Sequence, residues 1–253
     1  MPAAHESIVI LGGGQAAAWA AKTLRTEGYG GALSMVSEET HAPYERPALS
    51  KGVLGGTVAP ESIQVFRPDV LASLDLDLRQ GVRALAVDRA ARRVSLSDGT
   101  SVCYDKLLIC TGGKASRPRV DGIDLPGVFT LRTIDDCRDI GAALATARRV
   151  CVIGGGWIGL EVASTAIGLG KDVVLLERGS RLCQRVLPET VAEQLLALHR
   201  KSGVQVRLAT VAERIERMSG RLQVRTAEGE AVDADLVVVG VGLVPNDELA
   251  AQA

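Results

Sequence analysis

One pattern occurs twice in this chain of 253 residues: an aliphatic run, three glycines and a stretch of helical character. After each helical stretch comes a second aliphatic run that ends at an acid, Glu38 in the first copy and Glu177 in the second. Strand, glycine turn, helix and strand form the βαβ unit of a parallel sheet, so the repeat predicts two such units. The segments are residues 7–11, 12–14, 15–25 and 33–36 in the first copy, and 149–153, 154–156, 157–169 and 172–176 in the second.

Each half then continues with a β-hairpin that turns at an acid followed by glycine, and with a strand that ends at glycines. These segments are residues 93–104 and 106–112, and residues 221–234 and 236–242. We therefore predict an α/β fold with two Rossmann-like, three-layer dinucleotide-binding domains, each with a parallel sheet and a β-hairpin or meander. Prolines and glycines in residues 114–128 indicate the boundary. The predicted domains are residues 1–116 and 117–245, with residues 246–253 beginning a return to the first.

Composition excludes several other classes of protein. Apolar residues make up 47% and charged residues 23%, which is typical of a soluble globular chain and not of a disordered or fibrous one. The net charge of −1 gives no indication of binding to nucleic acid or to an anionic membrane. The chain has no secretory signal and no apolar run of membrane-spanning length. Five scattered cysteines indicate neither a disulfide framework nor a metal site, and favour free thiols in a reducing cytoplasm.

The glycine turns have the spacing of dinucleotide-binding fingerprints. The first glycine allows a tight turn, the second lets the backbone approach a pyrophosphate, and a small third residue lets the helix pack on the strand. Amides at the helix N-terminus then stabilise the phosphate charge. Each copy follows a strand, lies at the start of a helix and precedes an acid by somewhat more than 20 residues. The alternative is that the glycines serve helix packing alone. The residues are Gly12, Gly14 and Ala17, and Gly154, Gly156 and Gly159.

Each acid that follows the second strand is a candidate ligand for ribose hydroxyls. The alternative is that Glu38 and Glu177 only cap the next turn. A carboxylate at Glu177 would repel a 2′-phosphate, which favours NADH over NADPH, although Arg178 and Arg181 lie nearby with the opposite charge. Two dinucleotide sites in one chain indicate an electron relay in which one nucleotide is a resident flavin and the other a visiting nicotinamide.

Residues 42–66 lack clear periodicity and contain three prolines, which indicates a functional or disordered loop. Within it, residues 43–51 (PYERPALSK) resemble the flavin-loop motif of NADH–ferredoxin reductases. These FAD flavoproteins supply electrons to a small [2Fe–2S] ferredoxin in bacterial Rieske dioxygenase and cytochrome P450 systems, including those of aromatic hydrocarbon catabolism. Further matching segments are residues 104–112, 131–136, 152–161 and 237–246, in the order of the family. The loop motif is specific, whereas the glycine turns are shared with the wider glutathione-reductase-like superfamily.

The resemblance implies a role for individual residues in binding FAD. The pyrophosphate would be bound by Gly12, Gly14, Ala16 and Ala17, the adenosine ribose by Glu38, and the adenine by the backbone of Val82. The flavin would be contacted by Arg46, Pro47 and Lys51, and the rest of the pocket would be formed by Thr111, Gly112 and Arg132. For NAD the implied residues are Gly154, Gly156, Ile158 and Gly159, with Glu177 on the ribose and Gly240 and Gly242 bordering the nicotinamide end.

Lys51 and Glu161 are the implied catalytic residues, Lys51 near the isoalloxazine and Glu161 near the nicotinamide and Lys51. A cation beside the flavin stabilises its anionic reduced form, which supports Lys51 independently. Simpler interpretations remain: Lys51 as a solvated loop lysine, Arg46 as a surface ion-paired residue, and Glu161 as an exposed carboxylate favoured by the helix dipole.

We expect an FAD-dependent reductase that passes electrons from NADH to a [2Fe–2S] ferredoxin serving an oxygenase. The alternatives are a reductase of the rubredoxin or nitrite-reductase type, an NADH oxidase, and a nucleotide-binding protein without turnover. No cysteine pair of disulfide-reductase spacing is present, so we expect no protein-borne disulfide acceptor.

The chain departs from the family pattern in two places. Family members continue beyond the position of Ala253 through a Gly-Asp motif and a third domain, so we expect a fragment or truncated chain that holds FAD loosely. Residues 114–117 also replace an Ala-x-Pro-Arg segment, which puts only the local loop path in doubt.

Overall fold

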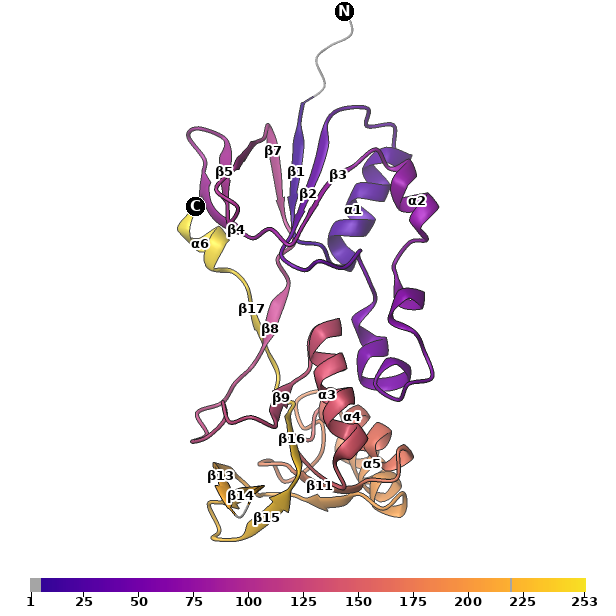
Figure 1. The fold of residues 1–253 in the computed structure, drawn as a ribbon, viewed down its shortest axis with the longest axis vertical. Coiled ribbons are helices and arrows are strands. Elements are labelled where there is room, and N and C mark those ends of the chain that lie inside the picture. The colour runs from indigo at the N-terminus through magenta and orange to yellow at the C-terminus, as the bar shows by residue number, and fades with distance from the viewer. Residues whose placement is uncertain (1–5, 219) are drawn as a thin grey trace, which may run out of the picture. The chain divides into compact units, whose positions relative to one another are not determined.

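A computed structural model describes residues 6–218 and 220–253 (Figure 1). The chain forms two compact units. The first contains the chain up to Glu45, Glu61–Lys114 and Pro245–Ala253, and the second contains Arg46–Pro60 and Ala115–Val244. The predicted domain boundaries follow residues 116 and 245, and the chain passes from one unit to the other after residues 114 and 244. The predicted boundaries kept residues 46–60 in the first domain, however, whereas in the structure this segment packs in the second unit.

The first unit has a parallel sheet in the strand order β3-β2-β1-β7. Its strands are β1 (Ile8–Leu11), β2 (Leu33–Ser37), β3 (Asp77–Gln80) and β7 (Lys106–Ile109), and its helices are α1 (Gln15–Thr26), α2 (Pro68–Ser73) and α6 (Glu248–Gln252). A separate antiparallel sheet contains β4 (Ala84–Asp88), β5 (Arg93–Leu96) and β6 (Ser101–Cys103).

The strands of the first unit bury alternate residues on opposite faces, as a covered sheet requires. On β1, Ile10 packs with the alanines of α1, whereas Val9 and Leu11 pack with Val94 and Leu96 of the antiparallel sheet. This gives three layers: helix, parallel sheet and antiparallel sheet. Each fully buried aliphatic side chain of this kind contributes roughly 1.5–3 kcal/mol to stability.

The second unit repeats this arrangement with a five-stranded parallel sheet, β12-β11-β10-β16-β9. Its strands are β9 (Val128–Thr130), β10 (Arg149–Ile153), β11 (Asp172–Leu176), β12 (Gln205–Arg207) and β16 (Leu236–Val239), and its helices are α3 (Ile134–Thr146), α4 (Trp157–Gly168) and α5 (Glu189–Lys201). The antiparallel sheet contains β13 (Ala212–Met218), β14 (Arg221–Thr226) and β15 (Ala231–Ala234). No helix in the described part of the chain is long and apolar enough to cross a membrane.

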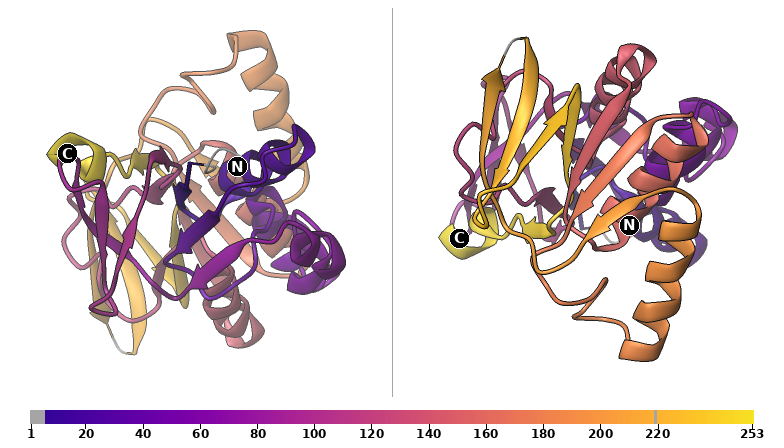
Figure 2. Two further views of the ribbon diagram at one scale, coloured as in Figure 1. Left: turned by 90° about the horizontal axis from the view of Figure 1, so that it is seen from above. Right: turned by 90° about the horizontal axis from the view of Figure 1, so that it is seen from below.

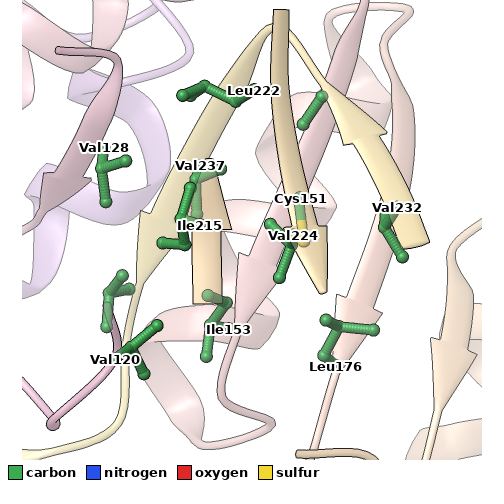
Figure 3. Packing of buried hydrophobic residues seen from close by; sticks show 12 residues of the cluster. Val120, Val128, Cys151, Ile153, Leu176, Ile215, Leu222, Val224, Val232 and Val237 are labelled. Atoms are coloured by element: carbon green, nitrogen blue, oxygen red, sulfur yellow. The ribbon is translucent and has the colours of Figure 1, made fainter. Parts of the chain in front are cut away.

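Aliphatic side chains join the two sheets of the second unit. Cys151, Ile153 and Val237 from the parallel sheet pack against Ile215 and Val224 of the antiparallel sheet (Figure 3). The view from below in Figure 2 shows the antiparallel strands, in yellow and orange, beside the parallel sheet. A low aromatic content is sufficient here, because β-branched and aliphatic residues fill the space between the layers.

Shorter segments complete the chain. Two strands, β8 (Gly113–Ala115) and β17 (Leu243–Pro245), form a two-stranded sheet where the chain passes between units. Residues 46–63 contain short helices at Arg46–Ala48, Leu49–Val53 and Pro60–Ile63, of which Leu49–Val53 is π-helical. The π-helical segment packs on α3 and α4 of the second unit.

The structure confirms the predicted fold class, both glycine-turn βαβ units and both hairpins, β5–β6 and β14–β15. It adds elements that were not predicted from the sequence, among them α3, α5, and the strands β3, β4, β9, β12 and β13. Several of these strands have only three or four residues, too few for a clear alternation of apolar and polar side chains.

Each unit fixes the start of its central strand with an aspartate. In the second unit, Asp235 Oδ2 accepts hydrogen bonds from the backbone amides of Arg148 and Arg149, both at 2.9 Å. In the first unit, Asp105 Oδ2 accepts from the amide and the hydroxyl of Ser7, at 2.8 and 2.9 Å. The Arg149 amide is the main reason that the pKa of Asp235 lies below its ordinary value. Both aspartates directly precede the strand that pairs with the central strand.

We expect Asp235→Ala to lower the free energy of unfolding by about 1–3 kcal/mol at pH 7, because two backbone amides lose a charged acceptor. The folded-state pKa is lowered, so this contribution is present above the unfolded pKa near 4 and is lost as pH falls toward the folded value. The difference from wild type should therefore shrink below about pH 4. Urea unfolding at several pH values measures it, with the exposed Asp139→Ala on α3 as control. Equal stability of the two variants would contradict this role.

Candidate dinucleotide-binding turns

The first glycine of each turn is required by the protein itself. Gly12 has φ +122°, and a Cβ on it would lie 2.1 Å from the carbonyl oxygen of Cys110, at the end of β7. Gly154 has φ +110°, and its Cβ would lie 2.6 Å from the oxygen of Gly240, at the end of β16. Both the left-handed backbone and the close carbonyl exclude a side chain. These two glycines allow the chain to turn directly beside the neighbouring strand.

The third position differs between the copies. A Cβ on Gly159 would lie 2.0 Å from the oxygen of Gly154, so only glycine fits there. The first unit instead places Ala17 at this point of α1, where it is completely buried. Each residue allows its helix to pack against the turn, and α4 packs more closely than a methyl group allows.

The second glycine of each turn has no such constraint. Gly14 and Gly156 have extended backbone with φ near −85°. A Cβ on Gly14 would meet no atom within 4 Å, and one on Gly156 would have only the oxygen of Gly240, at 3.9 Å. Neither the backbone nor the packing explains glycine here. Close approach of a ligand to the backbone does explain it.

The helices that follow the turns present uncapped amides. Within the described residues, neither α1 nor α4 has a side-chain N-cap. By contrast, α3 has a capping box in which Thr133 and Asp136 each bond to the other's backbone amide. Free amides and the positive end of the helix dipole stabilise an anion. Open space at the second glycine and an uncapped helix therefore fit a dinucleotide pyrophosphate in both units.

Glu177 braces the turn that it follows. Its Oε2 accepts a hydrogen bond from the Gly155 amide at 2.5 Å, and its Oε1 accepts one from the Gly179 amide at 2.6 Å. The carboxylate is half-buried beside Gly155, where any side chain would collide with it. Each carboxylate oxygen has a further lone pair, so the same group can still accept from a ribose hydroxyl.

Glu38 does not occupy the corresponding place in the first unit. Leu11 pairs with Val36 in the first sheet as Ile153 pairs with Leu176 in the second, so the counterpart of Glu177 is Ser37. Glu38 lies one residue later, where its side chain is 68% exposed and lies 3.8 Å from Arg83. The two acids that the sequence analysis treated alike therefore differ in position.

The structure joins the predicted catalytic residues. Lys51 Nζ lies 2.8 Å from Glu161 Oε1, and it also donates to the carbonyl of Pro47 at 2.9 Å. Glu161 is on the first turn and a half of α4, with a quarter of its side chain exposed. Lys51 is therefore ion-paired, although half of its side chain is exposed, and Glu161 is only partly exposed.

Other predicted residues also make contacts. Arg46 Nη1 donates to the carbonyl of Arg132 at 2.6 Å, within the second unit. In the first unit, the amide of Val82 donates to the carbonyl of Ser37 at 2.9 Å. Ala16 and Ile158 are exposed on the first turns of α1 and α4. Gly242 has φ +135° and lies near Arg185.

Sequence reasoning did not identify two residues in these networks. Asn246 donates its side-chain amide to the carbonyl of Thr111 at 3.0 Å and its backbone amide to Gly112, while the Thr111 hydroxyl donates to the Asn246 carbonyl at 2.6 Å. Ser50, described further below, contacts Glu161. Both residues belong to segments that resemble the family, and this resemblance was the feature of the sequence that could have identified them. The described residues contain no cluster of three or more possible metal ligands.

Comparisons with known proteins agree with this geometry. A family profile described as "Pyridine nucleotide-disulphide oxidoreductase" matches residues 6–253. The ferredoxin–NAD(+) reductase component of the biphenyl dioxygenase system of Paraburkholderia xenovorans is 38% identical, over 98% of this chain and 60% of that protein. The rubredoxin–NAD(+) reductase of Pseudomonas putida is 34% identical, over 98% of this chain and 64% of that protein.

Among solved structures, the ferredoxin reductase for the CYP199A2 system of Rhodopseudomonas palustris superimposes with a TM-score of 0.93 at 32% identity. The match covers 97% of this chain and 61% of that one. This chain therefore spans about three fifths of the length of the proteins that it matches.

We expect Gly156→Ala to weaken NADH binding roughly tenfold or more, since the methyl group enters the space where a phosphate would approach. The melting temperature should stay close to that of wild type, because the methyl group meets no protein atom closer than 3.9 Å. Calorimetric titration with NADH measures the affinity. Gly141→Ala on α3, where a Cβ would meet nothing within 4 Å, is the matched control. Unchanged affinity would show that the position does not face the ligand.

Proposed function

Because the chain belongs to the pyridine nucleotide-disulphide oxidoreductase family, we propose that it is the dinucleotide-binding part of an NADH-oxidising flavoprotein that reduces a [2Fe–2S] ferredoxin. One observation carries the proposal: the chain holds two glycine turns, each with an open second glycine and an uncapped helix. A dehydrogenase with a single cofactor needs one such turn. Two turns fit a relay between two dinucleotides.

We assign FAD to the first unit and NAD to the second. The Glu177 carboxylate supports NAD in the second unit, since it lies at the turn and carries a charge that opposes a 2′-phosphate. In the first unit, the exposed Glu38 and the backbone of Val82 are the candidates for the adenosine half of FAD. Bound FAD would take a hydride from NADH and release electrons singly to a one-electron carrier.

The residues of the chain supply placement and charge for this chemistry. Lys51 provides a fixed positive charge, which stabilises an electron-rich ring system nearby. Glu161 holds the lysine in place through the 2.8 Å ion pair, and the Pro47 carbonyl accepts a hydrogen bond from the same ammonium group. The amides at the start of α1 and α4 hold the phosphates. We assign no general acid or base, because hydride and electron transfer need none from the protein.

The names of the relatives support the proposed acceptor and its use. The Paraburkholderia relative belongs to a biphenyl dioxygenase system, and the solved structure to a cytochrome P450 system. We therefore propose that the ferredoxin serves an oxygenase, as in aromatic hydrocarbon catabolism. Similarity to a rubredoxin reductase supports a second candidate, in which the acceptor is a rubredoxin. Five free thiols support a reducing cytoplasm as the location.

The test of the function combines two assays on the protein supplied with FAD. Anaerobic NADH should bleach the visible absorbance of the flavin, and a nucleotide-binding protein without turnover would not do this. Reduction of cytochrome c that depends on added [2Fe–2S] ferredoxin would then support the proposed acceptor. Stronger dependence on rubredoxin, or consumption of oxygen without either carrier, would overturn it in favour of the other reductases or of an oxidase.

Replacement of Lys51 tests the proposed charge. We expect Lys51→Met to slow flavin reduction by NADH roughly tenfold and to lower the flavin reduction potential, because a positive charge is lost. Stopped-flow bleaching and a dye-coupled potential measurement give both values. The control is Lys201→Met at the exposed end of α5, which also removes one positive charge but at a position 150 residues from Lys51 in the sequence. An unchanged potential and rate would make Lys51 a surface lysine.

Nucleotide preference tests the role of Glu177. We expect turnover with NADH to exceed turnover with NADPH, and Glu177→Gln to reduce that ratio about five- to tenfold by removing the negative charge. Glutamine is preferable to alanine, because its side-chain oxygen can still accept from one turn amide. The values of kcat/KM for both nucleotides measure the ratio. Equal or better turnover of the unmodified protein with NADPH would contradict the assignment.

A further inference from the structure

Ser50 precedes Lys51 in the π-helical segment and is almost completely buried, with 1% of its surface exposed. Its hydroxyl donates to Glu161 Oε2 at 2.5 Å. The other oxygen of the same carboxylate, Oε1, receives Lys51. Two neighbouring residues of the segment thus use the two oxygens of one carboxylate.

A second contact from α4 holds the backbone of Ser50. Thr165 donates its hydroxyl to the Ser50 carbonyl at 2.8 Å. Glu161 and Thr165 are four residues apart on α4, so they lie on the same face of the helix. From α3, the Cys137 thiol donates to the preceding carbonyl, that of Leu49, at 3.2 Å. The path of the backbone is therefore fixed without the Ser50 hydroxyl.

The Ser50 hydroxyl therefore has a role other than holding the backbone of the segment. Main-chain contacts from Thr165 and Cys137 position the segment, whereas the Ser50 hydroxyl bonds only to the Glu161 carboxylate among the described residues. A hydroxyl–carboxylate bond is charge-assisted and stronger than a neutral one. A carboxylate held at both oxygens cannot rotate away from either partner, whereas one held only by an exposed lysine can.

We propose that Ser50 is a positioning residue for the Lys51–Glu161 pair: it orients the Glu161 carboxylate, which in turn holds the Lys51 ammonium group. The catalytic importance of this rests on the proposed function, in which Lys51 and Glu161 act beside the cofactors. The positioning itself is a property of the second unit and can be measured without a cofactor.

The first measurement is the rate at which an amine-reactive reagent labels Lys51 in the 253-residue chain, followed by peptide mass spectrometry. A lysine must leave its ion pair to react, so a looser Glu161 raises the rate. We expect Ser50→Ala to speed the labelling of Lys51 about threefold or more relative to Lys201 in the same sample. Ser164→Ala, which removes an exposed hydroxyl from the same helix, is the matched control and should leave the rate unchanged.

A double-mutant cycle separates positioning from a general loosening of the fold. If Ser50 acts through the Glu161 carboxylate, Ser50→Ala should have little further effect in a Glu161→Gln background. An equal increase in both backgrounds, or no increase in either, would overturn the proposal. Should Ser50→Ala unfold, Ser50→Cys has a similar volume and only a weak donor, and the same cycle applies.

The second measurement uses the protein loaded with FAD. We expect Ser50→Ala to lower the limiting rate of flavin reduction about three- to tenfold, with little change in the concentration of NADH that gives half of that rate. A variant that weakens NADH binding and leaves the limiting rate intact would contradict the positioning role. If the wild-type flavin is not reduced by NADH at all, the proposed function fails, and the labelling cycle still decides the role of Ser50.

Discussion

The close approach of a strand-end carbonyl to the first glycine controls the geometry of both units. Cys110 and Gly240 each direct a carbonyl oxygen at the place where Gly12 and Gly154 would carry a Cβ. Because no side chain intervenes, each helix begins directly at the carboxyl edge of its sheet. The backbone amides of the first helical turn then lie at that edge without a capping side chain. The packing of the backbone itself thus exposes amides in an arrangement that suits an anion.

Comparison of the two glycine turns distinguishes the positions that packing requires to be small from the position that a ligand would require to be glycine. Packing determines the first glycine in both units and the third small residue, which is alanine in one unit and glycine in the other. No contact among the described residues requires the second glycine, yet it is present in both copies. Its retention in two differently packed turns agrees with a common ligand group, the pyrophosphate of a dinucleotide.

The sequence was sufficient for those features that depend on short-range patterns. Glycine spacing, aliphatic runs and acid–glycine turns predicted the βαβ units and both hairpins, because each is determined by its own residues. The loop motif also led to the pairing of Lys51 with Glu161. The position of each acid relative to its glycine turn could not be predicted in this way. Six residues separate α1 from β2, but only three separate α4 from β11. Counting from the glycines therefore does not align Glu38 with Glu177. Residues 46–60 lack periodicity, and their place depends on distant contacts with α3 and α4.

The packing of residues 46–60 in the second unit has a consequence for the order of folding. Ser50 and Glu161 are separated by 111 residues, so docking of this segment closes a long loop, at an entropic cost of about 4 kcal/mol. That cost is recovered only after α3 and α4 have packed on their sheet, and contacts of such long range form late. We therefore expect the glycine turns to form first, each within its own βαβ unit, and the lysine–glutamate pair to assemble at the end. A chain halted before that step would carry both glycine turns but lack the ordered lysine.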